Sequence, residues 1–181
     1  MRTIILDPGH GLGNRRPGVF DPGATSNGVR EADVVMVWTN ELRSILRSMG
    51  YRVIRTRAHP GDPAHIGQRA SIARQYGGDI MLSLHCNAFN GTAQGTETFY
   101  RGSNNLILAT QINQAVVNAL GTTNRGAKTE AQSQHRRLAV MNFQPTFLLE
   151  IGFIDHPGDR AKMTDPALRR AACEAIAPLL V

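Results

Sequence analysis

The sequence predicts a single α/β domain in which a central, mostly parallel sheet of about six strands is flanked by helices. Short apolar runs alternate along the chain with longer segments whose apolar residues recur every three or four positions. This alternation is typical of strand–helix–strand units, which build parallel sheets. The 181 residues suit one domain over residues 1–181, because a chain of this size buries about 70% of its unfolded surface.

The first strand is expected over residues 3–6, where β-branched and aliphatic side chains suit a buried pleated surface. Pro8 then removes a ladder donor and Gly9 permits a tight bend. His10 should therefore lie at the carboxyl end of a central strand, where open α/β sheets bind their ligands. This position makes His10 a candidate metal ligand or catalytic base, although a lone histidine is more often structural.

Residues 11–28 are expected to form a long loop, because Gly, Pro, Asn and Asp dominate the segment. A phosphate-binding loop is disfavoured, since the spacing is not Gly-x-Gly-x-x-Gly. An amphipathic helix should follow from Glu31 to Met49, with Gly50 as its stop. Glu31 in the first turn is either a partner of the helix dipole or a ligand close to His10.

The middle of the chain continues the alternation. Further strands are expected over residues 51–56, 80–85 and 96–100, and the second of these ends in His85, repeating the pattern of His10. Helices are expected over residues 62–76, with Asp62 as cap, and from Asn104 or Asn105 to Leu120, with Gly121 as stop.

The last third combines a polar loop with two short apolar runs. Residues 122–137 are expected to be loop, and residues 138–141 a short strand. Residues 147–151 should form a strand that presents Glu150 where its apolar run ends. A closing helix is expected over residues 165–180, with Asp165 as cap and Pro166 at its first position.

Three strand ends and one helix start would thus present His10, Glu31, His85 and Glu150. Two imidazoles and one carboxylate form the ligand set of open catalytic zinc sites, whose fourth position is taken by water. A second glutamate beside that water could accept and return a proton. The residues are too scattered for spacing alone to establish a site, so the chemistry makes a metal hydrolase one candidate and leaves structural roles open.

Four segments carry a resemblance to a known family, and they occur in the family's order over nearly the whole chain. They are Asp7-Pro-Gly-His-Gly11, Asp21-Pro-Gly-Ala24 with Gly28-Val-Arg-Glu31, Ser83-Leu-His-Cys-Asn-Ala88, and Leu149-Glu-Ile-Gly-Phe-Ile154. Together they resemble the zinc-dependent N-acetylmuramoyl-L-alanine amidases, also called amidase type 3. The resemblance implies a mixed sheet, one Zn²⁺ per chain held by His10, Glu31 and His85, and Glu150 as the catalytic glutamate.

The implied reaction is hydrolysis of the peptidoglycan amide that joins N-acetylmuramic acid to L-alanine of the stem peptide. Arg69 matches an arginine of the family, and a structural salt bridge is its alternative role; Asn87 is a second candidate for supporting the site or contacting substrate. Residues 11–28 and 122–137 would form the groove walls, their arginines facing a carboxylate-bearing stem peptide. Two residues depart from the family: Asp155, where the family usually has Asn, and Arg74, where Asn often follows the alanine.

Composition restricts the partners. Lys and Arg exceed Asp and Glu by 20 − 14 = 6, which favours an anionic partner such as peptidoglycan. Nucleic acid is disfavoured, since aromatic residues are only 6% and no nucleic-acid motif occurs. The two cysteines provide no disulfide framework. No apolar run approaches the roughly 20 residues of a membrane span.

The N-terminus shows no signal peptide. We expect the protein to be a monomer. We also expect it to act at the bacterial cell wall, in the periplasm or outside the cell; if it is a phage lysin, it would stay in the cytoplasm until it is released. Two other functions remain open at this point. A zinc peptidase that cuts within the stem peptide would use the same ligands, and a non-catalytic basic domain would bind wall polymer or nucleic acid without chemistry.

Overall fold

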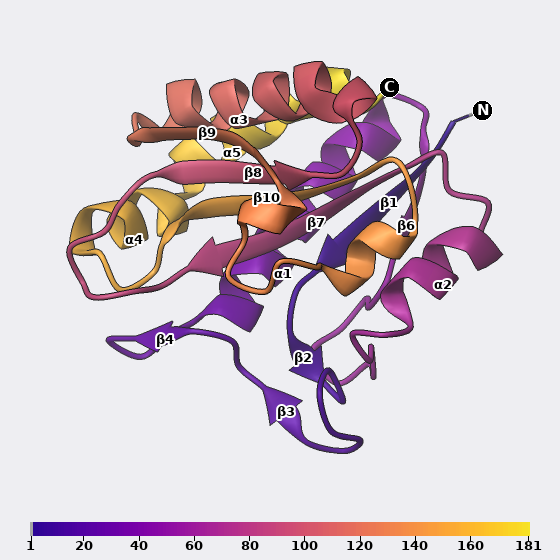
Figure 1. Ribbon diagram of the computed structural model, residues 1–181, viewed down its shortest axis with the longest axis horizontal. Coiled ribbons are helices and arrows are strands. Elements are labelled where there is room, and N and C mark those ends of the chain that lie inside the picture. The colour runs from indigo at the N-terminus through magenta and orange to yellow at the C-terminus, as the bar shows by residue number, and fades with distance from the viewer. Residues whose placement is uncertain (1) are drawn as a thin grey trace.

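The computed structural model describes residues 2–181 and contains a six-stranded sheet with the strand order β6-β1-β7-β10-β8-β9 (Figure 1). The strands are β1 (Thr3–Pro8), β6 (Arg52–Arg55), β7 (Ile80–Asn87), β8 (Thr96–Tyr100), β9 (Asn124–Thr129) and β10 (Thr146–Phe153). Only β8 and β10 pair antiparallel; the other neighbours in this sheet are parallel. The predicted α/β domain with a mixed, mostly parallel sheet is confirmed.

Helices cover both faces of the sheet. The helices are α1 (Glu31–Ser48), α2 (Arg69–Gln75), α3 (Leu106–Leu120), α4 (Pro157–Thr164) and α5 (Pro166–Ile176). Figure 1 shows α3 and α5 above the sheet and α2 on its other side. None of the helices within residues 2–181 is long and apolar enough to cross a membrane.

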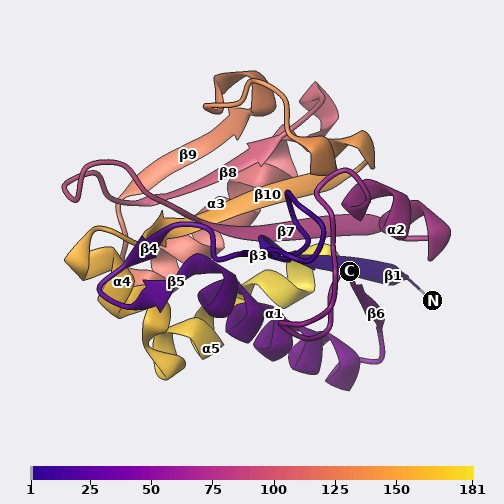
Figure 2. The ribbon, with the colours of Figure 1, turned by 90° about the horizontal axis from the view of Figure 1, so that it is seen from below.

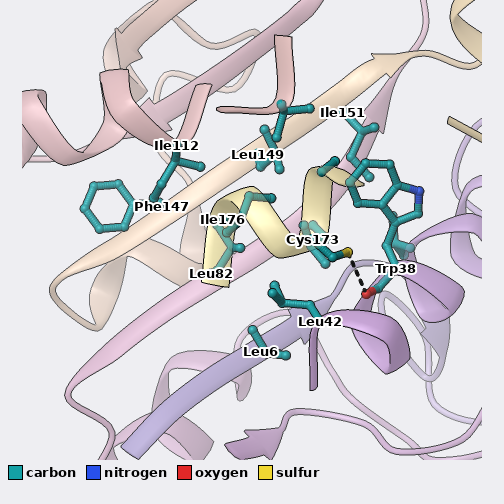
Figure 3. Close-up of a cluster of buried hydrophobic side chains, with 14 of the residues drawn as sticks. Leu6, Trp38, Leu42, Leu82, Ile112, Phe147, Leu149, Ile151, Cys173 and Ile176 are labelled. Atoms are coloured by element: carbon teal, nitrogen blue, oxygen red, sulfur yellow. Dashed lines mark hydrogen bonds between the residues drawn. The ribbon is translucent and has the colours of Figure 1, made fainter. Parts of the chain in front are cut away.

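The larger core lies between the sheet and α1, α3 and α5 (Figure 3). Alternate residues of the central strands point into it, because successive side chains of a strand face opposite sides. Trp38 of α1 is 1% exposed, and its indole Nε1 donates a hydrogen bond to the Met163 carbonyl at 2.9 Å. Other members of this core are Leu6, Leu42, Leu82, Ile112, Phe147, Leu149 and Ile176. Each such side chain stabilises the fold by about 1.5–3 kcal/mol on leaving water, and together they hold α1 against β1 and β7.

Two predictions in the last third of the chain are wrong. The run Leu138–Met141 is not a strand, because Ala139–Asn142 form a 3₁₀ helix, η3, whose Val140 and Met141 pack with α2 on the second face of the sheet. The sixth strand is instead β9, within the stretch expected to be loop. β9 is polar because it is an edge strand, and its backbone is ordered by parallel pairing with β8 rather than by apolar burial.

Several helix boundaries also differ from those expected. The helix expected over residues 62–76 is shorter, since α2 begins at Arg69, and the Asp62 carboxylate caps a turn by accepting from the Ala58 and His59 amides. Asn105 precedes α3 without a capping bond, because its side chain donates to the Arg101 carbonyl. Asp165 does cap α5, accepting from the amides of Ala167 and Leu168.

Additional short elements appear where loop or a single helix was expected. The segment 11–28 contains parts of two small hairpins, β2 (Gly11–Leu12) with β3 (Phe20–Asp21), and β4 (Thr25–Ser26) with β5 (Val29–Arg30). Helix α4 was not predicted, and α5 ends at Ile176 before a 3₁₀ helix, η4 (Ala177–Leu180). The 3₁₀ helices η1 (Ser103–Asn105) and η2 (Glu130–Gln132) complete the list.

Candidate active site

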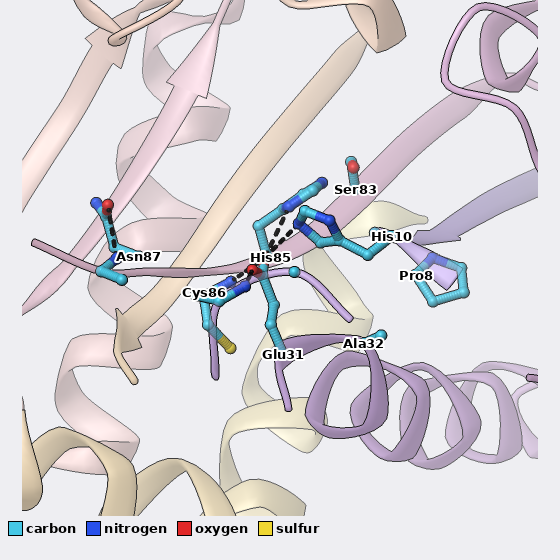
Figure 4. Close-up of polar contacts among 12 residues, drawn as sticks. Pro8, His10, Glu31, Ala32, Ser83, His85, Cys86 and Asn87 are labelled. Atoms are coloured by element: carbon cyan, nitrogen blue, oxygen red, sulfur yellow. Dashed lines mark hydrogen bonds and ion pairs between the residues drawn. The ribbon is translucent and has the colours of Figure 1, made fainter. Parts of the chain in front are cut away.

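The side chains of His10, Glu31 and His85 point toward one another near the carboxyl ends of β1 and β7 (Figure 4). One ligand atom from each lies within 4.8 Å of the other two. His10 Nε2 is 3.0 Å and His85 Nδ1 is 2.9 Å from Glu31 Oε1. The structure therefore brings together the three residues that the sequence proposed as ligands.

His10 is held by the end of β1 and by the first hairpin. Its backbone φ is 59°, a left-handed value uncommon for a residue with a side chain. His10 Nδ1 lies 3.0 Å from Asp21 Oδ2, which also accepts from Asn14 Nδ2 at 2.7 Å. A carboxylate on the outer imidazole nitrogen fixes the ring orientation and leaves Nε2 directed at Glu31, as in many metal sites.

Glu31 begins α1, so the helix places its carboxylate between the two imidazoles. Its Oε1 accepts from the Cys86 amide and its Oε2 from the Ala24 amide, both at 2.9 Å. Burial opposes the charge, but hydrogen bonds and charge interactions with His10 and His85 keep the pKa of Glu31 well below its usual range. Glu31 is therefore an ionised, buried carboxylate rather than a simple partner of the helix dipole.

The donor set fits zinc. Two imidazole nitrogens and one carboxylate oxygen are the ligands of catalytic Zn²⁺ sites. The three side chains border a cavity of about 400 Å³ that also reaches Glu150. A ligand set that opens on a cavity leaves room for water and substrate, whereas structural zinc sites are closed by four protein ligands.

Glu150 lies within β10 rather than at its end, which corrects the sequence prediction. The strand continues past a register shift to Phe153, and Glu150 is paired with His85 of β7 on one side and Glu97 of β8 on the other. Residues so paired face the same side of the sheet. Its Oε2 is buried and accepts no hydrogen bond from any residue in the range 2–181.

The surroundings of Glu150 suit a proton acceptor. Burial, together with the nearby negative charges of Glu31 and Glu97, raises the pKa of Glu150 well above its usual value. A carboxylate with a raised pKa binds a proton more readily near neutral pH. The free oxygen and this basicity distinguish Glu150 from Glu31, whose oxygens are both occupied.

Arg69 and Asn87 have different places in the site. Arg69 donates to Asp7 Oδ1 at 2.6 Å and to the carbonyl of His10 at 2.7 Å, so it supports the backbone that presents His10. Asn87 Nδ2 donates to Glu97 Oε1 at 2.7 Å, and Glu97 lies one strand farther from His85 than Glu150 does. Arg69 thus takes the structural ion pair that was its alternative role, and it also borders the cavity.

Sequence reasoning missed two supporting residues. Asp21 orients His10, and its place in the segment Asp21–Ala24 was the available signal. Arg57 donates to the carbonyls of Pro8, Gly9 and Ala32 and so ties the end of β1 to the start of α1. Burial lowers the pKa of Arg57 to about 10. No pattern in the sequence marks Arg57, because its partners are backbone atoms distant along the chain.

The predicted groove walls are found only in part. Arg15 from the first loop and Arg125 from β9 border the cavities around Glu150, together with Gln134 and His135. Arg16, Arg136 and Arg137 are not among the lining residues.

A partly buried His–Glu–His set beside a free carboxyl, at the carboxyl ends of a mostly parallel sheet, is the arrangement expected of a metal-dependent hydrolase. Comparison with known proteins agrees with this class. The N-acetylmuramoyl-L-alanine amidase family matches residues 4–180, and the chain belongs to this family.

Sequence relatives support the assignment. An uncharacterized cell wall amidase of Bacillus anthracis is 35% identical over 191 residues, which cover 97% of this chain and 34% of the relative. The N-acetylmuramoyl-L-alanine amidase LytC of Bacillus subtilis (strain 168) is 29% identical over 181 residues, covering 96% of this chain and 34% of LytC. The chain therefore spans about a third of the length of these two relatives.

The fold has close counterparts among solved structures. The catalytic domain of CwlV, an N-acetylmuramoyl-L-alanine amidase from Bacillus (Paenibacillus) polymyxa var. colistinus, superposes with a TM-score of 0.85 at 24% identity. The match covers 99% of this chain and 96% of that domain. At this identity the likeness concerns the fold.

Proposed function

We propose that this chain is a zinc-dependent amidase that hydrolyses the bond between N-acetylmuramic acid and L-alanine in peptidoglycan. Residues 1–181 would form one catalytic domain that acts as a monomer on the bacterial cell wall. The observation that carries the proposal is the meeting of His10, Glu31 and His85 within 4.8 Å, beside the unpartnered oxygen of Glu150. Membership of the amidase family supplies the substrate.

In this proposal His10, Glu31 and His85 hold the metal. A bound Zn²⁺ lowers the pKa of a water toward about 7 and polarises a carbonyl oxygen. Glu150 accepts the proton of the attacking water and returns it to the leaving amine nitrogen of L-alanine. The raised pKa of Glu150 favours the first proton transfer. Its place within β10, a central strand, holds its carboxyl in one position for both transfers.

Other residues of the chain keep these groups in place. Asp21 holds the His10 ring through Nδ1, and Arg69 and Arg57 fix the backbone on either side of the turn at Gly9. Such supporting contacts matter because a displacement of about 1 Å can cost on the order of 100-fold in rate.

Metal content and product chemistry test the proposal. Purified protein should carry about one zinc per chain, and digestion of purified peptidoglycan should expose the amine of L-alanine and leave sugar strands without stem peptides. A peptidase that cuts within the stem would expose other amines, and a non-catalytic binding domain would expose none. Full activity after exhaustive chelation would contradict the role of zinc.

A further inference from the structure

A second cavity of about 330 Å³ adjoins the candidate active site on the side of β8 and β9. Six residues border both cavities and form their common wall: Asn87, Gln134, His135, Leu138, Leu148 and Glu150. The second cavity does not reach His10, Glu31 or His85. Glu150 therefore stands between the ligand set and a separate space.

The floor of this second cavity carries a basic cluster, made up here of Glu97, Arg125 and Lys128. Glu97 Oε2 accepts from Arg125 Nε at 2.8 Å and from Lys128 Nζ at 2.6 Å, while Oε1 accepts from Asn87. Burial opposes the charge of Glu97, but the two cations hold its pKa below the usual value. Two cations and one carboxylate leave the cluster with a net charge of 2 − 1 = +1.

The two cations keep hydrogen-bond donors for a further partner. A lysine ammonium has three donors, and within residues 2–181 that of Lys128 makes one bond, to Glu97. The Arg125 guanidinium donates from Nε to Glu97 and from Nη1 to the Gln94 carbonyl at 3.5 Å, which leaves its Nη2 donors, and its Cζ lies 4.9 Å from the centre of the Phe153 ring. The side chains of Arg125 and Lys128 are 33% and 27% exposed, and both residues border the second cavity.

The register of the sheet places Glu97 of this cluster in one row with Glu150 and His85. His85, Glu150 and Glu97 occupy paired positions on β7, β10 and β8, and β9 lies beyond them (Figure 2). The charged groups of Arg125 and Lys128 contact the Glu97 side chain, and Glu97 lies on the strand next to that of Glu150. These cationic heads therefore lie one strand spacing, ~5 Å, from Glu150. A substrate amide with its carbonyl toward His85 and its nitrogen at Glu150 would direct the leaving peptide toward Glu97.

We propose that Arg125 and Lys128 form a subsite that binds the free carboxylate of the second stem-peptide residue, on the leaving-group side of Glu150. This inference rests on the proposed function. Two extended residues span at most about 7 Å, which is enough to reach cationic heads that lie about one strand spacing from Glu150. The subsite makes the protein selective for stems whose second residue is a γ-linked glutamate with a free α-carboxylate, against stems in which that group is a carboxamide.

Binding and cleavage of a matched ligand pair test the subsite. The probes are N-acetylmuramoyl-L-alanyl-γ-D-glutamyl-L-lysine and its D-isoglutamine counterpart, both with an amidated C-terminus so that one carboxylate distinguishes them. Calorimetric titration of zinc-loaded Glu150→Gln measures binding without turnover. The free acid should bind about tenfold or more tightly than the amide, as expected for charge-assisted hydrogen bonds.

Substitutions in the basic cluster should move this preference in opposite directions. Arg125→Gln and Lys128→Gln should each bring the ratio of the two dissociation constants toward one. Glu97→Gln removes the carboxylate within the cluster and makes the cluster more positive. It should therefore increase the ratio of the amide's dissociation constant to that of the acid. Arg47→Gln removes an exposed cation of α1 and serves as the control for total charge, with the wild-type ratio expected. Melting temperatures establish that each variant is folded.

The outcomes separate the subsite from the proposed function. Two results would overturn the proposed subsite. One is equal binding of both probes by Glu150→Gln protein whose basic cluster is intact, and the other is a preference for the acid that persists in both Arg125→Gln and Lys128→Gln. If wild-type protein releases the alanine amine equally well from both probes, the amidase stands and the subsite falls. If the preference depends on Arg125 and Lys128 but no alanine amine is released, the subsite stands and the proposed function falls.

Discussion

The Arg69 guanidinium donates to the Asp7 carboxylate at 2.6 Å, and the two side chains are 2% and 0% exposed. The same carboxylate accepts from the hydroxyls of Thr56 and Ser83, so it links β1 with β7 and with the segment after β6. Arg69 in turn donates to the carbonyls of Pro8 and His10. This buried ion pair holds the end of β1, from which His10 projects.

Removing one partner of this pair should be costly. We expect Arg69→Met to lower the free energy of unfolding by about 3–5 kcal/mol, because Asp7 would remain as a buried, uncompensated charge. Arg74→Met on the exposed side of the same helix is the matched control, with a loss below about 1 kcal/mol. Urea unfolding of the metal-free proteins measures both, and a loss for Arg69→Met no larger than the control would contradict the role of the pair.

The same pair should make stability depend on acid. Burial would raise the pKa of Asp7, but Arg69, Ser83 and Thr56 lower it below its usual value. A folded-state pKa below the unfolded one means that the ionised carboxylate stabilises the fold at pH above about 4, and that this contribution is lost as pH falls through the folded-state pKa.

The difference in unfolding free energy between wild type and Asp7→Asn should therefore be largest between pH 5 and 7 and should shrink progressively in acid below about pH 4. Unfolding curves of metal-free protein at pH 6, 4 and 3 provide the measurement. A difference that stays constant with pH would mean that the pKa of Asp7 is the same in the folded and unfolded protein, and a difference that grows in acid would mean that folding raises this pKa.

The two glutamates of the site should respond differently to the same substitution. Glu31→Gln replaces a charged oxygen that faces both imidazoles, so it should lose zinc and activity together. Zinc content by mass spectrometry and amine release from peptidoglycan are measured side by side. Retention of one zinc per chain by Glu31→Gln would remove Glu31 from the ligand set.

Glu150→Gln should keep its zinc while the rate falls on the order of 10²- to 10⁴-fold, the usual contribution of a general base. Because burial raises the pKa of Glu150 above its unfolded value, its ionised form destabilises the metal-free protein as pH rises above about 4. Glu150→Gln should thus raise the unfolding free energy of metal-free protein, relative to wild type, more at pH 7 than at pH 4. A purely structural glutamate would give the opposite result, lower stability with near-normal turnover per folded molecule.

Gly9 should be required for the placement of His85. A Cβ at Gly9 would lie 2.3 Å from the His85 ring, so Gly9→Ala must displace the imidazole and should weaken zinc binding. At Gly61 an added Cβ meets no atom within 4 Å, and Gly61→Ala is the control that should leave zinc affinity unchanged. Competition with a chromophoric chelator gives the two affinities, and equal values would show that the His85 ring is not confined by the turn at Gly9.

The sequence by itself determined the parts of the protein that local chemistry specifies. Apolar runs that stop at Pro8 and near His85, and the amphipathic helix that begins at Glu31, each predict an element and the residue it presents. These elements depend on burial, and burial leaves a periodic apolar pattern in the chain. The same patterns, with the four family segments, were sufficient to name His10, Glu31, His85 and Glu150.

Only the tertiary structure decided the features that depend on partners distant in the chain. β9 carries no apolar pattern because pairing with β8 satisfies its backbone at the sheet edge, whereas the apolar run at Val140 proved to be a 3₁₀ helix packed against α2. The basic cluster around Glu97 likewise exists only because the strand order places β9 beside β8. Hydrogen bonds and ion pairs of this kind require a particular neighbour rather than burial alone, so no local pattern in the sequence records them.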